Sequence, residues 1–221
     1  MKMKSALLSL GTVALLAVGI SGCSTPAPAA PSSSAAVEQT PSPTPTPTAE
    51  ESVSLVVTSS GLELHTGDAV TASWNYDAID DAAVAGIGAV LGFEPVVATA
   101  STSCEGGSCL VTSWTWEGLE LRLRDVPTPV GAGFVSVTAP TVSGIPIFAA
   151  DGSAVGDDAA PIIAANPEGL EQIDEYSVVW VGRTPVENAQ REDAFRAVSL
   201  ILDADHALVS RIGAPSANYG M

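Results

Sequence analysis

Apolar and polar residues alternate in short segments from residue 52 onward, a pattern typical of half-buried β-strands. The clearest segment is 119–124, where leucines alternate with Glu120, Arg122 and Arg124. This alternation predicts an antiparallel strand with one face against the core and the other toward solvent. Weaker patterns of the same kind predict further strands at 53–58, 62–65, 69–76, 96–100, 110–116, 134–138, 144–147, 177–182, 195–202 and 207–212.

Two segments have helical spacing instead. Apolar residues recur three or four positions apart over 78–91, which predicts a helix with Asp77 as its N-cap and Gly92 at its end. A shorter helix is expected over 155–166, because aspartates stand near its start and Pro167 follows it.

The order of the predicted elements occurs twice along the chain. Thr58 and Thr138 are 80 positions apart, and so are the first aspartates of the two predicted helix starts. Equal offsets at two landmarks favour a tandem repeat, although few residues are identical between the halves. We therefore expect an α+β fold of two tandem repeats, each a helix with an antiparallel β-meander, over 52–129 and 130–221.

Residues 1–22 have the order of parts of a bacterial lipoprotein signal peptide. Lys2 and Lys4 give a positive start, and an apolar stretch over 6–20 follows. That stretch is too short for a stable membrane-spanning helix. It leads into Ile-Ser-Gly-Cys, which resembles a lipobox and predicts that Cys23 becomes the lipid-modified N-terminus. The alternative is an ordinary secretory signal followed by a chance cysteine.

The segment 23–51 begins with the predicted lipid site and continues as a tether. Residues 24–51 contain seven prolines, five serines, five threonines and six alanines, and no aromatic residue. Such a segment buries too little surface to offset the entropy of ordering, so we expect it to be disordered. Fully extended as polyproline II, it would reach on the order of 80 Å. Its hydroxyl groups permit O-glycosylation.

Charge excludes several classes of function. Asp and Glu number 25 against eight Lys and Arg, for a net charge of −17. We expect no nucleic-acid partner, because few cations are present to neutralise phosphates. The only lysines are Lys2 and Lys4, so the mature chain has none for a P-loop or a Schiff base.

Two further cysteines, Cys104 and Cys109, flank four residues that include adjacent glycines. In an exported protein this arrangement predicts a disulfide across a hairpin tip. The alternative is a metal or redox pair, but no histidine lies nearby and four residues intervene where such pairs usually have two.

Candidate catalytic and metal-binding groups are sparse. His65 and His206 are far apart in sequence, and no serine-nucleophile or zinc-protease motif accompanies them. The pair Gly86 and Gly88 lacks the third glycine of a dinucleotide fingerprint and lies within a predicted helix. Capping explains the aspartates near the helix starts. We therefore predict no catalytic residue, no metal and no cofactor.

The aromatic residues allow a binding hypothesis. Trp114 and Trp116 share one face of a predicted strand next to the disulfide tip at 105–108. Core packing is one interpretation, and an exposed platform that stacks on a glycan or a partner protein is the other. On the second interpretation, a partner would bind the first half of the folded part, near these tryptophans.

A resemblance adds to this picture. The pair Cys104 and Cys109, the sequence Trp-Thr-Trp-Glu-Gly-Leu-Glu-Leu over 114–121 and the glycine- and aspartate-bearing segment 144–160 resemble a broad group of actinobacterial secreted proteins and lipoproteins with tandem α+β repeats. The group implies no known activity, substrate or catalytic residue. The repeat order is also distantly similar to beta-lactamase inhibitory protein and to small outer-membrane assembly lipoproteins. Those proteins bind other proteins through a sheet, which is a likeness of fold alone.

These features predict a lipoprotein held by Cys23 on the extracytoplasmic face of a bacterial cell membrane. Its folded part is expected to be a non-catalytic binding or interaction module of the cell envelope. The alternative is an envelope enzyme with an unrecognised active site. Expected partners are the membrane, through the N-terminal lipid, and a cell-envelope protein or glycan.

Overall fold

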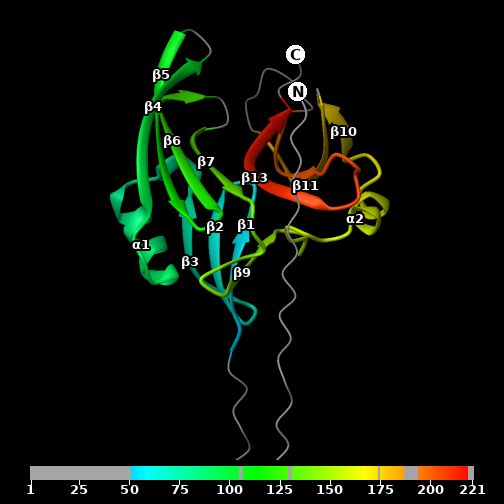
Figure 1. Cartoon of the computed structure of the whole chain (residues 1–221), viewed down its shortest axis with the longest axis horizontal. Helices are drawn as coiled ribbons and strands as arrows, with labels where there is room; N and C mark the ends of the chain where they lie inside the picture. Colours follow the sequence, from blue (N-terminus) through cyan, green and yellow to red (C-terminus); the bar gives the residue numbers. More distant parts are fainter. Residues whose placement is uncertain (1–50, 105–106, 129–130, 174, 187–193, 219–221) are drawn as a thin grey trace, which may run out of the picture. The chain divides into compact units, whose positions relative to one another are not determined.

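A computed structural model describes residues 51–104, 107–128, 131–173, 175–186 and 194–218 (Figure 1). These residues all belong to one compact unit. The predicted signal peptide, Cys23 and the tether up to residue 50 lie outside the described residues. Within the described residues, no helix is long and apolar enough to cross a membrane.

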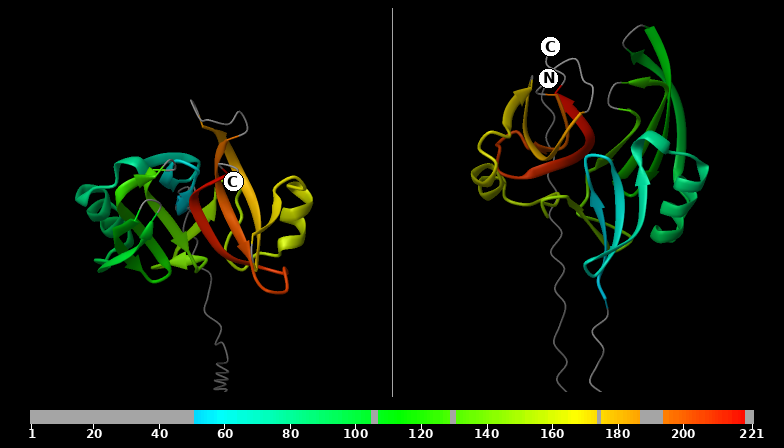
Figure 2. Two further views of the ribbon diagram at one scale, coloured as in Figure 1. Left: turned by 90° about the horizontal axis from the view of Figure 1, so that it is seen from above. Right: turned by 180° about the vertical axis from the view of Figure 1, so that it is seen from behind.

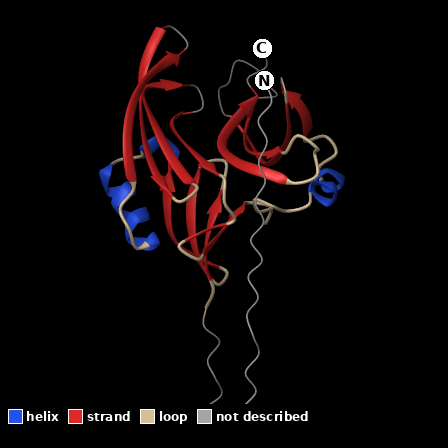
Figure 3. Cartoon of the chain, viewed as in Figure 1, coloured by secondary structure: helices blue, strands red, loops and turns tan. Residues whose placement is uncertain are grey.

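Strands dominate the described part of the chain (Figure 3). The helical elements are η1 Tyr76–Ala78, α1 Asp81–Leu91 and α2 Ala159–Ala165. The strands are β1 Val53–Val57, β2 Gly61–Thr66, β3 Ala69–Asn75, β4 Val96–Cys104, β5 Gly107–Trp116, β6 Leu119–Thr128, β7 Gly131–Val137, β8 Thr141–Val142, β9 Ile145–Ala149, β10 Leu170–Ile173, β11 Tyr176–Pro185, β12 Phe195–Leu202 and β13 Val209–Asn218.

The strands form two sheets. One has five strands in the order β3-β2-β1-β9-β8, and the other has eight in the order β10-β11-β12-β13-β7-β6-β5-β4. The strands β1 and β9 run parallel, with Leu55 opposite Ile147. In the large sheet, β7 pairs antiparallel with β13, with Val137 opposite Ile212. The protein is therefore mostly β.

The predicted α+β fold of two helix-plus-meander repeats is wrong. Strands from both predicted halves are neighbours in both sheets, because β1 pairs with β9 and β6 pairs with β7. The equal offsets do not mark equivalent elements either. Thr58 follows β1 in the five-stranded sheet, whereas Thr138 follows β7 in the eight-stranded sheet. Neither half therefore closes a sheet of its own.

The main core lies where apolar faces from both sheets and from α1 meet. The predicted alternation at 119–124 is confirmed, because Leu119 and Leu121 are buried while Arg122 and Arg124 lie on the other face of β6. Inward-facing residues of β1, β7, β11, β12 and β13 join the same cluster. Burial raises the pKa of the Tyr76 phenol in this core well above its usual value.

Helix α1 begins later than the sequence predicts. Its N-cap is Asp80, whose Oδ1 accepts a hydrogen bond from the Ala83 amide at 2.8 Å. Asp77 lies in η1 instead, and its carboxylate pairs with Arg196 of β12 at 2.9 Å. Gly92 ends the helix as predicted, in the left-handed conformation that glycine adopts without strain.

Helix α2 is close to its predicted position. Asp158 caps it by accepting a hydrogen bond from the Ala160 amide, and Asn166 ends it. The neighbouring Asp157 holds the preceding turn, because its Oδ2 accepts from the Ala154 amide at 2.8 Å. The aspartates singled out near both helix starts therefore form caps, turns and an ion pair.

Candidate functional site

The predicted disulfide is present at the end of a long hairpin. Cys104 and Cys109 are bonded, with their Cα atoms 5.8 Å apart. The hairpin predicted around them is confirmed, because β4 and β5 pair antiparallel with Cys104 opposite Gly107. Residues 105–106 at its tip lie outside the described residues.

The two tryptophans singled out for a binding face differ in exposure. Trp116 is fully buried, and its indole N–H donates to the Phe93 carbonyl at 3.2 Å. The ring also lies close to Gly88 of α1. Trp114 is half-buried and packs against the main core. Of the two interpretations of these aromatics, core packing therefore describes Trp116, whose ring offers no surface to a partner.

Strand β4, next to these tryptophans, is an exposed edge strand. It is the last strand of the eight-stranded sheet, so one side of its backbone has no neighbouring strand among the residues that the structure describes. Eight of its nine residues are exposed, and Val96 and Val97 keep 74% and 57% of their surface. The strand contains no charged residue and no proline.

The other side of β4 is held firmly to β5. Nine successive residue pairs join the two strands without a register shift. Hydroxyl groups add contacts across the pair: Thr99 to Thr112 at 3.2 Å, and Ser101 to Ser108 at 2.6 Å. In Figures 1 and 2 the hairpin extends past the neighbouring strands of the sheet. The edge of β4 is therefore both accessible and fixed in an extended conformation.

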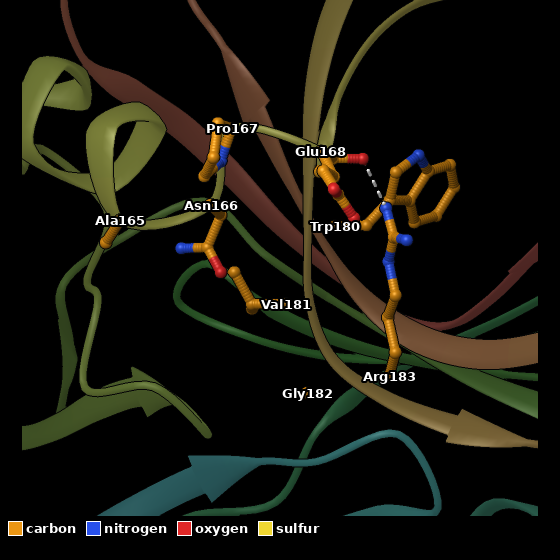
Figure 4. Close-up of a pocket in the computed structure, with 9 residues that line it drawn as sticks. Ala165, Asn166, Pro167, Glu168, Trp180, Val181, Gly182 and Arg183 are labelled. Carbon is orange, nitrogen blue, oxygen red and sulfur yellow. Dashed lines mark hydrogen bonds between the residues drawn. The ribbon is translucent and has the colours of Figure 1, made fainter.

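A pocket of about 390 Å³ lies between the end of α2 and β11 (Figure 4). Residues 165–169 and 180–183 line it. Arg183 donates to the Glu168 carbonyl at 2.9 Å, and its guanidinium lies 4.6 Å from the centre of the Phe195 ring. The indole N–H of Trp180 donates to Glu171 at 2.8 Å. The contact of Arg183 with Glu168 joins two walls of the pocket, whereas the other two contacts fix Arg183 and Trp180 to residues of the neighbouring strands.

The two histidines lie in different parts of the fold and contact different partners. His65 contacts Glu63 at 3.0 Å in the five-stranded sheet. His206 lies in the turn before β13, 3.2 Å from the hydroxyl of Ser177. That hydroxyl also donates to Gln172 at 2.7 Å.

Metal ligands do not gather within the described residues either. There, no three His, Cys, Asp or Glu side chains lie close enough together to hold a metal ion.

Sequence reasoning placed a strand at 96–100 but missed its position at the edge. One signal was present, because 96–104 is the sequence Val-Val-Ala-Thr-Ala-Ser-Thr-Ser-Cys. It lacks the alternation of a strand with one buried face, and it lacks the charges common on exposed strands.

Comparisons with known proteins do not identify a relative of this chain. A search of protein families, of curated proteins and of solved structures finds no match. The resemblances drawn from the sequence therefore stay expectations.

Proposed function

We propose that this protein is a lipoprotein of the bacterial cell envelope, held by Cys23 on the extracytoplasmic face of the membrane. Its folded part is a non-catalytic interaction module. It binds another protein by adding an extended segment of that partner to the free edge of β4. The observation that carries the proposal is the long, uncharged and exposed edge strand at the end of the large sheet.

The chemistry of strand addition fits β4. In this mode of recognition, main-chain N–H and C=O groups of the edge supply the affinity, and exposed side chains supply specificity. Proteins usually protect an edge with lysine, proline, a bulge or a short strand. The strand β4 has nine residues, no lysine, no proline and no register shift against β5.

A photo-crosslinking amino acid tests where the partner binds. It is placed at Val97 of β4 in one variant and at Val70 of β3 in the other. The two valines are a matched pair, exposed at 57% and 54% on the edge strands of different sheets. We expect adducts with an envelope protein from position 97 and none from position 70. Equal adducts from both positions, or none from position 97, would contradict the proposal.

The anchor needs a separate test. The Cys23→Ala variant should lose metabolic labelling with palmitate and leave the membrane fraction, because two or three acyl chains are what hold a lipoprotein stably. The Cys109→Ser variant is the control, since it also removes one cysteine and should keep its label. Continued labelling of Cys23→Ala would show that the lipid is attached elsewhere.

A further inference from the structure

We infer that the strand added to β4 is β4 of a second copy of this chain, paired antiparallel about Ala100. This inference rests on the proposed function, since it names the partner that the edge accepts. The result is a twofold-symmetric contact in which two eight-stranded sheets become continuous.

The composition of β4 suits pairing with itself. When a nine-residue strand pairs antiparallel with its own copy over its full length, the middle residue faces its symmetry mate. In β4 this residue is Ala100, with Thr99 opposite Ser101 of the second copy and Val97 opposite Ser103. Every pair is small or β-branched, and none brings two charges together. Thr–Ser pairs across strands also form favourable hydrogen bonds.

Charge gives a way to tell a second copy of this chain from a basic partner. The chain carries a net charge of −17, so two copies repel each other at long range. The strand β4 contains no acidic residue, which keeps this repulsion out of the contact itself. An edge that recognised a basic partner would carry acidic side chains, and β4 offers none. Salt should therefore strengthen the association, because it screens the repulsion between the two copies.

The surroundings of β4 leave room for a second hairpin. Residues 96–103 are exposed on both faces of the strand, so no other described element covers the edge from above or below. A contact of one strand with one strand is small, and such contacts are weak in dilute solution. Anchoring both copies to one membrane raises their effective concentration and compensates for this weakness.

The experiment uses the full-length lipidated protein in neutral detergent, where sedimentation reports the oligomeric state. In Ala100→Lys and in Ala100→Glu, two like charges face each other across the symmetric pair. Each variant alone should therefore have a dimer dissociation constant about tenfold higher than that of the unaltered protein, which corresponds to about 1.4 kcal/mol. Mixing the two variants should restore dimers, because Lys then faces Glu. Val70→Lys, on the edge strand β3 of the five-stranded sheet, should associate like the unaltered protein.

The outcomes separate the inference from the function on which it rests. Recovery of dimers in the mixture, together with stronger association at higher salt, supports pairing of β4 with itself. If the unaltered protein stays monomeric at every concentration, or if the mixture does not recover, the second copy is overturned. Adducts from position 97 with a different protein would in that case leave the proposed function standing. Circular dichroism of each variant confirms that it is folded.

Discussion

The eight-stranded sheet ends in two edge strands that are built differently. At one end β4 has nine residues, no charge and an exposed surface along almost its whole length. At the other end β10 has four residues and includes Glu171, which accepts a hydrogen bond from Trp180 of the adjacent strand. Short length and charge are the features that protect an edge from pairing. By these features β10 is a protected edge of the sheet, which we call its closed end, and β4 is an unprotected edge, which we call its open end.

The strands behind the two edges also differ. Trp116, at the end of β5, is fully buried in the main core. Trp180, on β11, keeps 8% of its surface and packs in a small separate cluster with Val178 and Ala197. The exposure of β4 is therefore not a sign of a loose region, because β5 of its hairpin is anchored by Trp116 in the larger of the two core clusters.

The largest effect is expected from Trp116→Ala. Removing this side chain leaves a cavity in the main core and an unpaired Phe93 carbonyl, so the free energy of unfolding should fall by about 3–5 kcal/mol. The matched change at the other end, Trp180→Ala, should cost about 2 kcal/mol, since its cluster is small and near the surface. Denaturant unfolding of both variants measures the difference. An equal or larger loss for Trp180→Ala would show that β5 is not anchored more strongly than β11.

Reduction of the Cys104–Cys109 disulfide should have an intermediate effect. The bond closes a very short loop, so on the chain-entropy model it stabilises the fold by about 2 kcal/mol. We expect a modest shift in the unfolding midpoint upon reduction, with the β-sheet circular dichroism spectrum unchanged under native conditions. Alkylation before and after reduction checks the bond itself. Two reactive thiols in freshly purified protein would refute the pairing. Global unfolding upon reduction would show that the disulfide stabilises the fold by much more than we expect.

The smallest effect concerns the closed end of the sheet. Glu171→Gln keeps an oxygen that accepts from Trp180 but removes its charge, so it should cost about 1 kcal/mol. In a Trp180→Phe background, which lacks the indole donor, the same change should cost almost nothing. Thermal unfolding of the four proteins in this cycle gives the coupling. A loss that persists without the indole would show that Glu171 stabilises β10 in another way.

Local patterns in the sequence predicted local structure well. The alternation at 119–124 is set by which side chains touch the core, and the strand there is correct. The spacing of Cys104 and Cys109 within an expected hairpin was enough to pair them. The helix end at Gly92 was correct because glycine alone adopts that backbone conformation without strain.

Non-local features were beyond the reach of those patterns. Asp77 and Asp80 are both good caps by residue type, and only the backbone of η1 decides between them. Alternation showed that Trp114 and Trp116 share a face but not that the core covers it. The parallel pairing of β1 with β9 joins segments about 90 residues apart, and no local signal specifies which strands become neighbours.

Hydrogen–deuterium exchange of the full-length lipidated protein tests most directly that β4 is the open, interacting edge. Exchange is compared between dilute detergent, where copies are separated, and densely loaded vesicles, where they meet. We expect those amides of 96–104 that face away from β5 to exchange quickly in the first state and to become protected in the second, while the alternate amides that donate to β5 stay protected in both. We also expect that amides of 170–173 in β10 do not change. Unchanged exchange in 96–104, or protection that appears in β10 instead, would show that β4 is not the edge at which copies of the protein pair.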